Sequence, residues 1–131
     1  MRVFADTSAL FSVINGNDDQ HDEAAALWNR LLDNGDVLLT TNCVVLETYT
    51  LLQSRSGMAA ARAFSERVVP YLSVVWMDEA LHERALATFL AAGERRLSLV
   101  DCASFTVCRD LAVDRVFAFD RHFEREGFSP A

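Results

Sequence analysis

The stretch RVFADTSAL, residues 2–10, decides how the fold begins. Residues 3–5 (VFA) form a short apolar run that is typical of a buried β-strand. Asp6 follows directly, and residues 9–14 predict the first turns of a helix. In an open α/β sheet, ligands bind at the carboxyl ends of the strands. An acid at such an end either caps the following helix or belongs to a binding site, and Asp6 alone does not decide between the two.

Beyond this stretch, segments typical of strands alternate with segments typical of helices. The predicted strands are residues 3–5, 37–40, 72–77 and 116–119, and the predicted helices are residues 9–14, 21–34, 42–54, 58–69, 78–93 and 98–111. The tail from residue 121 is expected to add a short helix and little else. This alternation implies a mostly parallel central sheet flanked by helices on both faces. The sequence therefore predicts an α/β fold that forms one domain over residues 1–131.

Composition narrows the class of protein further. No apolar run approaches the roughly 20 residues that span a bilayer. The early first strand also leaves no room for a signal peptide. Cys43, Cys102 and Cys108 are odd in number and lack the spacing of a metal site, so we expect three reduced core residues. These observations predict a cytoplasmic protein that does not bind membranes.

The net charge of −7 does not by itself predict nucleic-acid binding. The charge is unevenly distributed, however. Residues 1–36 contain two arginines and seven acids, whereas residues 84–131 contain seven of each. All twelve basic residues are arginine. The first part of the chain is therefore acidic, whereas its C-terminal part is close to neutral.

Four acids lie in apolar stretches, where an unpaired charge is rare. They are Asp6, Glu47, Asp101 and Asp120. Two of them follow predicted strands, and two lie on helices that can pack beside those strand ends. Carboxylates brought together repel one another, and a bound cation relieves the repulsion. Oxygen ligands without clustered histidine or cysteine predict Mg²⁺, or Mn²⁺ in its place.

Each acid also has a structural interpretation. Asp101 follows Ser98 by three residues, which fits a capping box, and Asp120 can cap a helix in the tail. Glu47 lies in the middle of a helix that Asn42 is expected to cap and that is apolar nearly all round, so we expect this helix to be largely buried. The structural alternative for Glu47 is therefore a buried arginine partner. One shared cause explains all four acids more simply. The histidines are scattered and are not expected to bind metal: His21, His82 and His122.

Four motifs resemble those of PIN-domain ribonucleases, and specifically those of the VapC toxins of bacterial toxin–antitoxin pairs. They are FADTSAL (residues 4–10), VVLETYTLL (44–52), LSLVDCASFTVCRDL (97–111) and VFAFDRHFEREGF (116–128). Their order and spacing match, and the resemblance covers essentially the whole chain. It implies that the four acids are metal ligands and that nearby hydroxyls support them, namely Thr7, Ser8 and Ser104. Many members carry Thr or Ser two residues before the last acid, where this chain has Ala118.

The resemblance also implies a function: Mg²⁺-dependent endoribonuclease activity, a homodimer, and inhibition by a cognate VapB-like antitoxin. The chemistry agrees, because metals held by carboxylates can activate water and stabilise the leaving oxygen in phosphodiester hydrolysis. Arginines around the site are expected to hold RNA phosphates, namely Arg95, Arg96, Arg121 and Arg125. The alternative is an ordinary solvated surface on which Arg121 pairs with Glu124 or Glu126.

Two other functions are weighed against this one. A phosphoryl-aspartate enzyme would use Asp6 as its nucleophile, but the chain has no lysine, and Ser8 stands where such phosphatases have a second aspartate. A non-catalytic PIN-like module that binds RNA or protein is the second alternative. Keeping all four acids argues against it. The high apolar content further predicts an exposed apolar groove that a partner covers.

Overall fold

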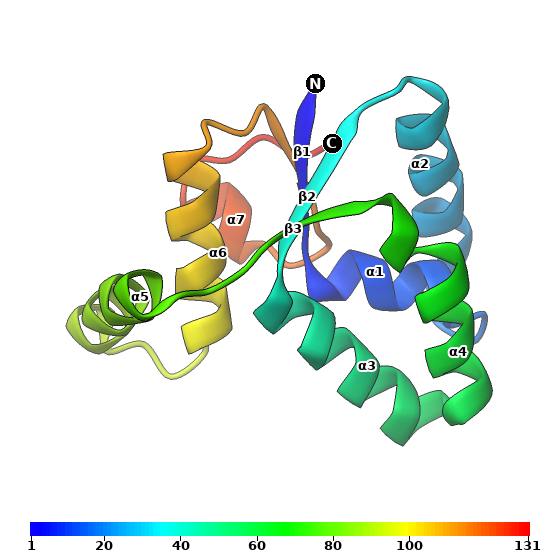
Figure 1. Ribbon diagram of the computed structural model, residues 1–131, viewed down its shortest axis with the longest axis horizontal. Helices are drawn as coiled ribbons and strands as arrows, with labels where there is room; N and C mark the ends of the chain where they lie inside the picture. Colours follow the sequence, from blue (N-terminus) through cyan, green and yellow to red (C-terminus); the bar gives the residue numbers. More distant parts are fainter.

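The computed structural model describes all 131 residues and contains one sheet of four strands in the order β3-β2-β1-β4 (Figure 1). The strands are β1 (Arg2–Ala5), β2 (Val37–Thr41), β3 (Leu72–Val75) and β4 (Arg115–Phe117). All three pairings are parallel, so every strand ends at the same edge of the sheet. The predicted α/β class with a parallel sheet is confirmed.

Helices cover both faces of this sheet. They are α1 (Thr7–Ile14), α2 (His21–Asp33), α3 (Asn42–Ser56), α4 (Met58–Arg67), α5 (Glu79–Ala92), α6 (Leu99–Asp110) and α7 (His122–Arg125), with a short 3₁₀ helix η1 (Val69–Tyr71) after α4. Figure 1 shows α1 to α4 on one side of the strands and α5 to α7 on the other. None of these helices is both long and apolar enough to cross a membrane.

The central strand β1 is buried because helices pack against it from both sides. Val3, Phe4 and Ala5 are completely inaccessible to solvent. Phe123 of the short helix α7 packs against Phe4 and against Phe105 of α6, with ring centroids 6.1 and 5.0 Å apart. Aromatic contacts of this kind contribute about 0.5–1.5 kcal/mol each beyond the burial of their area. A four-residue helix is thereby held firmly against α6 and β1.

The tail does more than the sequence predicted. After α7 the chain returns to the outer edge of β4, where the Val116 N–H donates to the Ser129 carbonyl at 2.9 Å. The Ala131 N–H donates back to the Val116 carbonyl at 2.9 Å. The expectation that the tail adds little beyond a helix is therefore wrong, because these residues pair with the exposed side of an edge strand.

The structure corrects the prediction for α3 in two respects. Thr41, and not Asn42, caps the helix, since the Thr41 hydroxyl accepts from the Val44 N–H at 3.1 Å. The Asn42 side chain instead accepts from the Met77 N–H at 2.7 Å, a partner far away in the sequence. The helix is also not largely buried, because only one of its sides packs against neighbours and Leu46 on another side is 63% exposed.

Smaller corrections concern the strand ends and one cysteine. β3 ends at Val75 and not at Met77, and β4 ends at Phe117 and not at residue 119. Cys102 and Cys108 are buried as expected, whereas Cys43 is only half-buried because it lies in the first turn of α3. All three cysteines are free thiols.

Candidate metal centre

Asp6 lies at the carboxyl end of β1 and is 5% exposed. Its carboxylate caps α1, because Oδ2 accepts from the Ser8 N–H at 3.2 Å and from the Ser8 hydroxyl at 2.8 Å. Burial raises the pKa of Asp6 to about 6; the Ser8 hydrogen bonds act in the opposite direction, and the charge of Asp101 raises the pKa further. Asp6 is therefore both a helix cap and a buried acid close to Asp101.

The ends of β1 and β4 are joined by hydrogen bonds through this same region. The Asp6 N–H donates to the Phe117 carbonyl at 3.0 Å. The Ser8 hydroxyl donates to Asp6 and accepts from the Phe119 N–H at 3.0 Å. Since Asp120 follows Phe119 directly, these contacts bring the last acid to the edge of the sheet where Asp6 lies.

Asp101 lies in the first turn of α6 and forms the capping box that its spacing from Ser98 predicts. The Asp101 N–H donates to the Ser98 hydroxyl at 3.0 Å, and the Ser98 N–H donates to Asp101 Oδ2 at 3.1 Å. The capping interpretation of Asp101 is thus confirmed. The same Oδ2 lies 3.3 Å from Nδ1 of His122, so this carboxylate faces the site as well.

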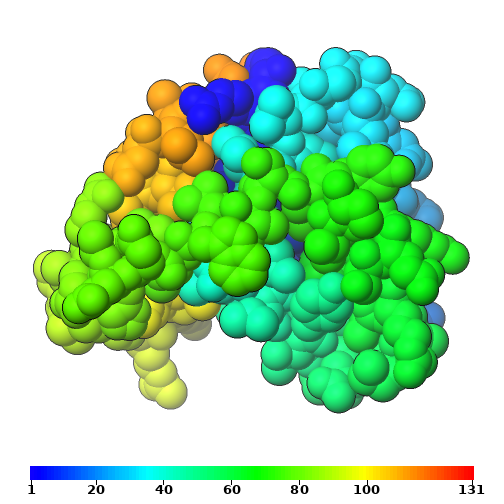
Figure 2. Space-filling model, in the orientation of Figure 1, coloured from blue at the N-terminus to red at the C-terminus, as the bar shows by residue number.

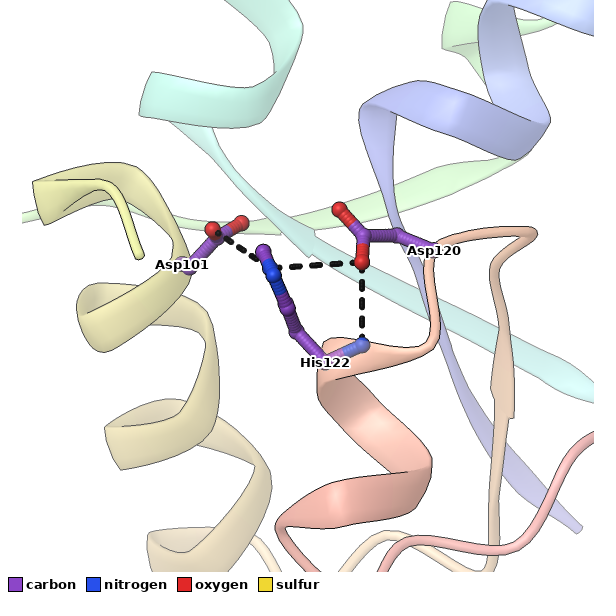
Figure 3. Close-up of side chains that lie close together, drawn as sticks. All are labelled: Asp101, Asp120 and His122. Carbon is purple, nitrogen blue, oxygen red and sulfur yellow. Dashed lines mark hydrogen bonds and ion pairs between the residues drawn. The ribbon is translucent and has the colours of Figure 1, made fainter. Parts of the chain in front are cut away.

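Asp101 and Asp120 flank the imidazole ring of His122 (Figure 3). Nδ1 of His122 lies 3.2 Å from Asp120 Oδ1, which also accepts from the His122 N–H at 2.9 Å. One ligand atom from each of these three residues lies within 4.8 Å of the others. The sequence prediction missed His122. Its only signal was its position two residues after Asp120.

Glu47 lies on α3, which begins at the same edge of the sheet directly after β2. It is half-buried and does not belong to the three-residue group. Burial and then the negative charge of Glu47 raise the pKa of the Cys43 thiol one turn earlier. No arginine forms an ion pair with Glu47, so its structural alternative, a buried arginine partner, is wrong.

Two of the three predicted supporting hydroxyls are buried without a partner. Thr7 Oγ1 and Ser104 Oγ accept and donate no hydrogen bond, whereas Ser8 is held by Asp6 and Phe119. Buried polar atoms in native proteins nearly always have a partner, including ordered water. Thr7 follows Asp6, and Ser104 lies one helical turn after Asp101. A bound cation with its water ligands is a type of partner that such hydroxyls can use.

No arginine lies within ion-pair distance of any of the four acids. The predicted RNA-contacting arginines are all exposed and form no ion pair themselves: Arg95, Arg96, Arg121 and Arg125. Glu126 pairs with Arg109 at 2.6 Å, and Glu124 forms no ion pair. The alternative in which Arg121 pairs with Glu124 or Glu126 is therefore wrong. The site thus combines carboxylates, an imidazole and unpaired hydroxyls, and no arginine side chain pairs with its acids. This set of donor atoms fits a divalent metal ion.

The comparisons with known proteins agree with this geometry. The PIN domain family matches residues 3–128. A 23S rRNA-specific endonuclease from Mycobacterium tuberculosis, VapC20, is 35% identical over 127 residues, which are 96% of this chain and 95% of the relative. Its crystal structure, described as that of a sarcin-ricin loop cleaving toxin, superposes with a TM-score of 0.87 at 34% identity, covering 98% of each chain. The structure of VapBC2 from Rickettsia felis bound to promoter DNA superposes with a TM-score of 0.69 at 13% identity, covering 100% of this chain and 98% of that chain. This match shows a similar fold.

Proposed function

We propose a function from the premise that the chain belongs to the PIN-domain family and is a VapC-like toxin. Residues 1–131 form one metal-dependent endoribonuclease domain that cuts ribosomal RNA. The contacts of Asp101 and Asp120 are the observation that carries the proposal. Both acids face one ring at the carboxyl edge of the sheet, and no arginine neutralises them. Carboxylates arranged in this way repel one another and destabilise the fold when no cation is bound, whereas a bound metal ion is stabilised by them.

We propose that Asp6, Glu47, Asp101 and Asp120 hold Mg²⁺, for which Mn²⁺ can substitute. A divalent ion held by these acids would supply an activated water and would stabilise the leaving oxygen in phosphodiester hydrolysis. The chain's own residues position the acids. Ser98 orients Asp101, the His122 N–H orients Asp120, and Ser8 orients Asp6.

The substrate proposal comes from the relatives. The 35% identical protein is a 23S rRNA-specific endonuclease, and its solved structure is described as cleaving the sarcin-ricin loop. We propose that this chain cuts the same class of substrate, a structured segment of 23S rRNA. Support comes from exposed, unpaired arginines that lie near Asp101 and Asp120 in the sequence, because guanidinium groups can bind phosphates with two parallel hydrogen bonds. Arg95 and Arg96 precede α6, and Arg121 and Arg125 flank and end α7.

We also propose a VapB-like antitoxin as partner, a homodimer, and a cytoplasmic location. The partner would cover apolar surface that the chain leaves exposed, as the sequence predicted. Trp76 is 74% exposed beside a groove of about 250 Å³ between α5 and α6, whose lining includes Leu81 and Val107. Figure 2 shows the green segment from β3 to α5 at the surface of the molecule.

The test is cleavage of purified 23S rRNA and of a hairpin containing its sarcin-ricin loop, with and without Mg²⁺ or Mn²⁺. We expect a defined cut that requires the metal and that EDTA abolishes. Fragment ends mapped by primer extension identify the site. Tight RNA binding without any cut, at every metal concentration, would support the non-catalytic binding module instead.

A further inference from the structure

We propose that His122 is a nitrogen ligand of the metal, so that the centre binds Mn²⁺ in preference to Mg²⁺. This inference rests on the proposed function, since it concerns the same metal centre. The four-acid ligand set implied by the family contains oxygen ligands alone. In the structure the imidazole of His122 lies next to two of these acids, Asp101 and Asp120.

The distances fit neighbouring ligands around one ion. At metal–ligand distances of about 2.1 Å, adjacent corners of an octahedron are about 3 Å apart. Nδ1 of His122 lies 3.3 Å from Asp101 Oδ2 and 3.2 Å from Asp120 Oδ1. Two of the three separations are thus already close to this value, and one ligand atom from each residue lies within 4.8 Å of the others (Figure 3).

The three side chains are held in these positions by contacts that do not involve a metal. The Ser98 N–H fixes Asp101, and the His122 N–H fixes Asp120. His122 itself begins α7, whose next residue, Phe123, is 2% exposed in the aromatic core. The ring is only 17% exposed and contacts no basic side chain. Packing of Phe123 therefore places His122 beside the two carboxylates, and the contacts of the ring with them orient its Nδ1.

Ligand chemistry then determines the preference among metals. Mg²⁺ favours oxygen ligands and retains its waters, whereas imidazole nitrogen favours transition ions. Mn²⁺ accepts carboxylates and imidazole together in octahedral geometry. Adding an imidazole to the carboxylates should therefore make the centre bind Mn²⁺ more tightly than carboxylates alone would, with little gain for Mg²⁺.

The experiment measures binding and not turnover. Calorimetric titrations give the Mn²⁺ and Mg²⁺ affinities of the wild-type chain, His122→Asn and His122→Gln. Loss of the His122 ligand should weaken Mn²⁺ binding at least 10-fold, because removing a residue that only supports a ligand already weakens metal binding by about 10-fold or more. Mg²⁺ affinity should change by less than about 3-fold. Pulsed EPR of bound Mn²⁺ should show coupling to a ¹⁴N nucleus in the wild type and none in the two variants.

Two controls assign the signal. His82 is exposed on α5 and its ring forms no hydrogen bond, so His82→Asn should retain full Mn²⁺ affinity and the coupling. The double variant His21→Asn/His82→Asn leaves His122 as the only histidine and should retain the coupling as well. Labelling with ¹⁵N-histidine tests the wild-type chain without any substitution, because the ¹⁴N signal must then disappear.

The outcomes separate this inference from the proposed function. Bound Mn²⁺ that shows no nitrogen coupling, but is lost in Asp101→Asn, would overturn the histidine ligand and leave the carboxylate centre intact. Binding that Asp101→Asn and Asp120→Asn leave unchanged would place the ion elsewhere and overturn both proposals. Equal losses of Mn²⁺ and Mg²⁺ affinity in His122→Asn, without a ¹⁴N signal in the wild type, would reduce His122 to a residue that orients the acids.

Discussion

At the amino-terminal edge of the sheet the acids bind residues at the start of β1, whereas at the carboxyl-terminal edge the acids cap helices and face other acids or a histidine. Asp36, just before β2, forms an ion pair with the Met1 ammonium group at 2.8 Å. Asp114, just before β4, accepts from the Arg2 N–H at 2.8 Å. Asp6, at the other end of β1, is buried without a cation.

This difference shows what each edge contributes. Asp36 is half-buried and Asp114 is exposed, so a carboxylate with a cationic or N–H partner keeps its charge there at little cost, and such contacts fasten the strands where they begin. A buried carboxylate next to another acid destabilises the metal-free chain, so its presence indicates a role outside folding. The same residue type therefore serves structure at one edge of the sheet and is proposed to serve catalysis at the other.

The largest expected effect is on the rate of RNA cleavage, and it is measured by replacing one aspartate with asparagine at each edge of the sheet. Asp101→Asn should lower the single-turnover rate of RNA cleavage by about 100-fold or more, because a charge that stabilises the transition state through the metal is lost. The asparagine oxygen can still accept from the Ser98 N–H, so the cap of α6 persists. Asp114→Asn should leave the rate within about 2-fold of wild type. Equal rates in both variants would leave Asp101 with capping as its only role.

The next effect is on stability, and it should have opposite signs at the two edges. Burial raises the pKa of Asp6 from 3.8 to about 6, so the folded metal-free chain disfavours the charged form. About two pKa units correspond to roughly 3 kcal/mol, which Asp6→Asn should add to the free energy of unfolding at pH 7.5. Asp36→Asn should lower that free energy, since it removes an ion pair.

The pH dependence checks the sign of this effect. Because the folded-state pKa of Asp6 is raised, the metal-free wild type gains stability from this group as the pH falls from about 6 to about 4. The advantage of Asp6→Asn should therefore be full at pH 7.5 and nearly absent at pH 4. Urea unfolding of both chains with EDTA, at several pH values, measures the difference. A constant difference at every pH would show that burial of the Asp6 charge is not its cause.

The smallest effect is on RNA binding, and it compares two exposed arginines. Arg121→Ala should weaken binding of the hairpin and lower the slope of log affinity against log salt by about 1, as expected for one lost phosphate contact. Arg84 is held by Asp110 through two hydrogen bonds of 2.7 and 2.9 Å, so Arg84→Ala should change neither quantity. Filter-binding or anisotropy titrations at several salt concentrations distinguish the two. The same slope in Arg121→Ala and wild type would argue against a phosphate contact.

The sequence was sufficient to predict the sheet, the order of the elements and the meeting of Asp101 with Asp120, because apolar periodicity and strand ends are local signals. It treated capping and site formation as competing interpretations of Asp6 and Asp101. Both acids cap their helices and still face the site, since a carboxylate has more acceptor positions than a cap requires.

What the sequence did not predict depends on contacts between distant segments. His122 faces the acids because Phe123 anchors α7 in a core formed with Phe4 and Phe105, and no local pattern reveals that packing. Asn42 is drawn away from its cap by the N–H of Met77 in the same way. The proximity of Glu47 to the other acids stays a prediction.

The pairing of the tail with β4 limits how copies of this chain can associate through their sheets. A sheet with two open edges can add a neighbour on each side and grow into an open-ended filament. Here the hydrogen bonds of Val116 with Ser129 and Ala131 use the outer backbone groups of β4, and only β3 ends the sheet without a neighbouring strand. Edge-to-edge addition through β3 therefore stops after a single pair.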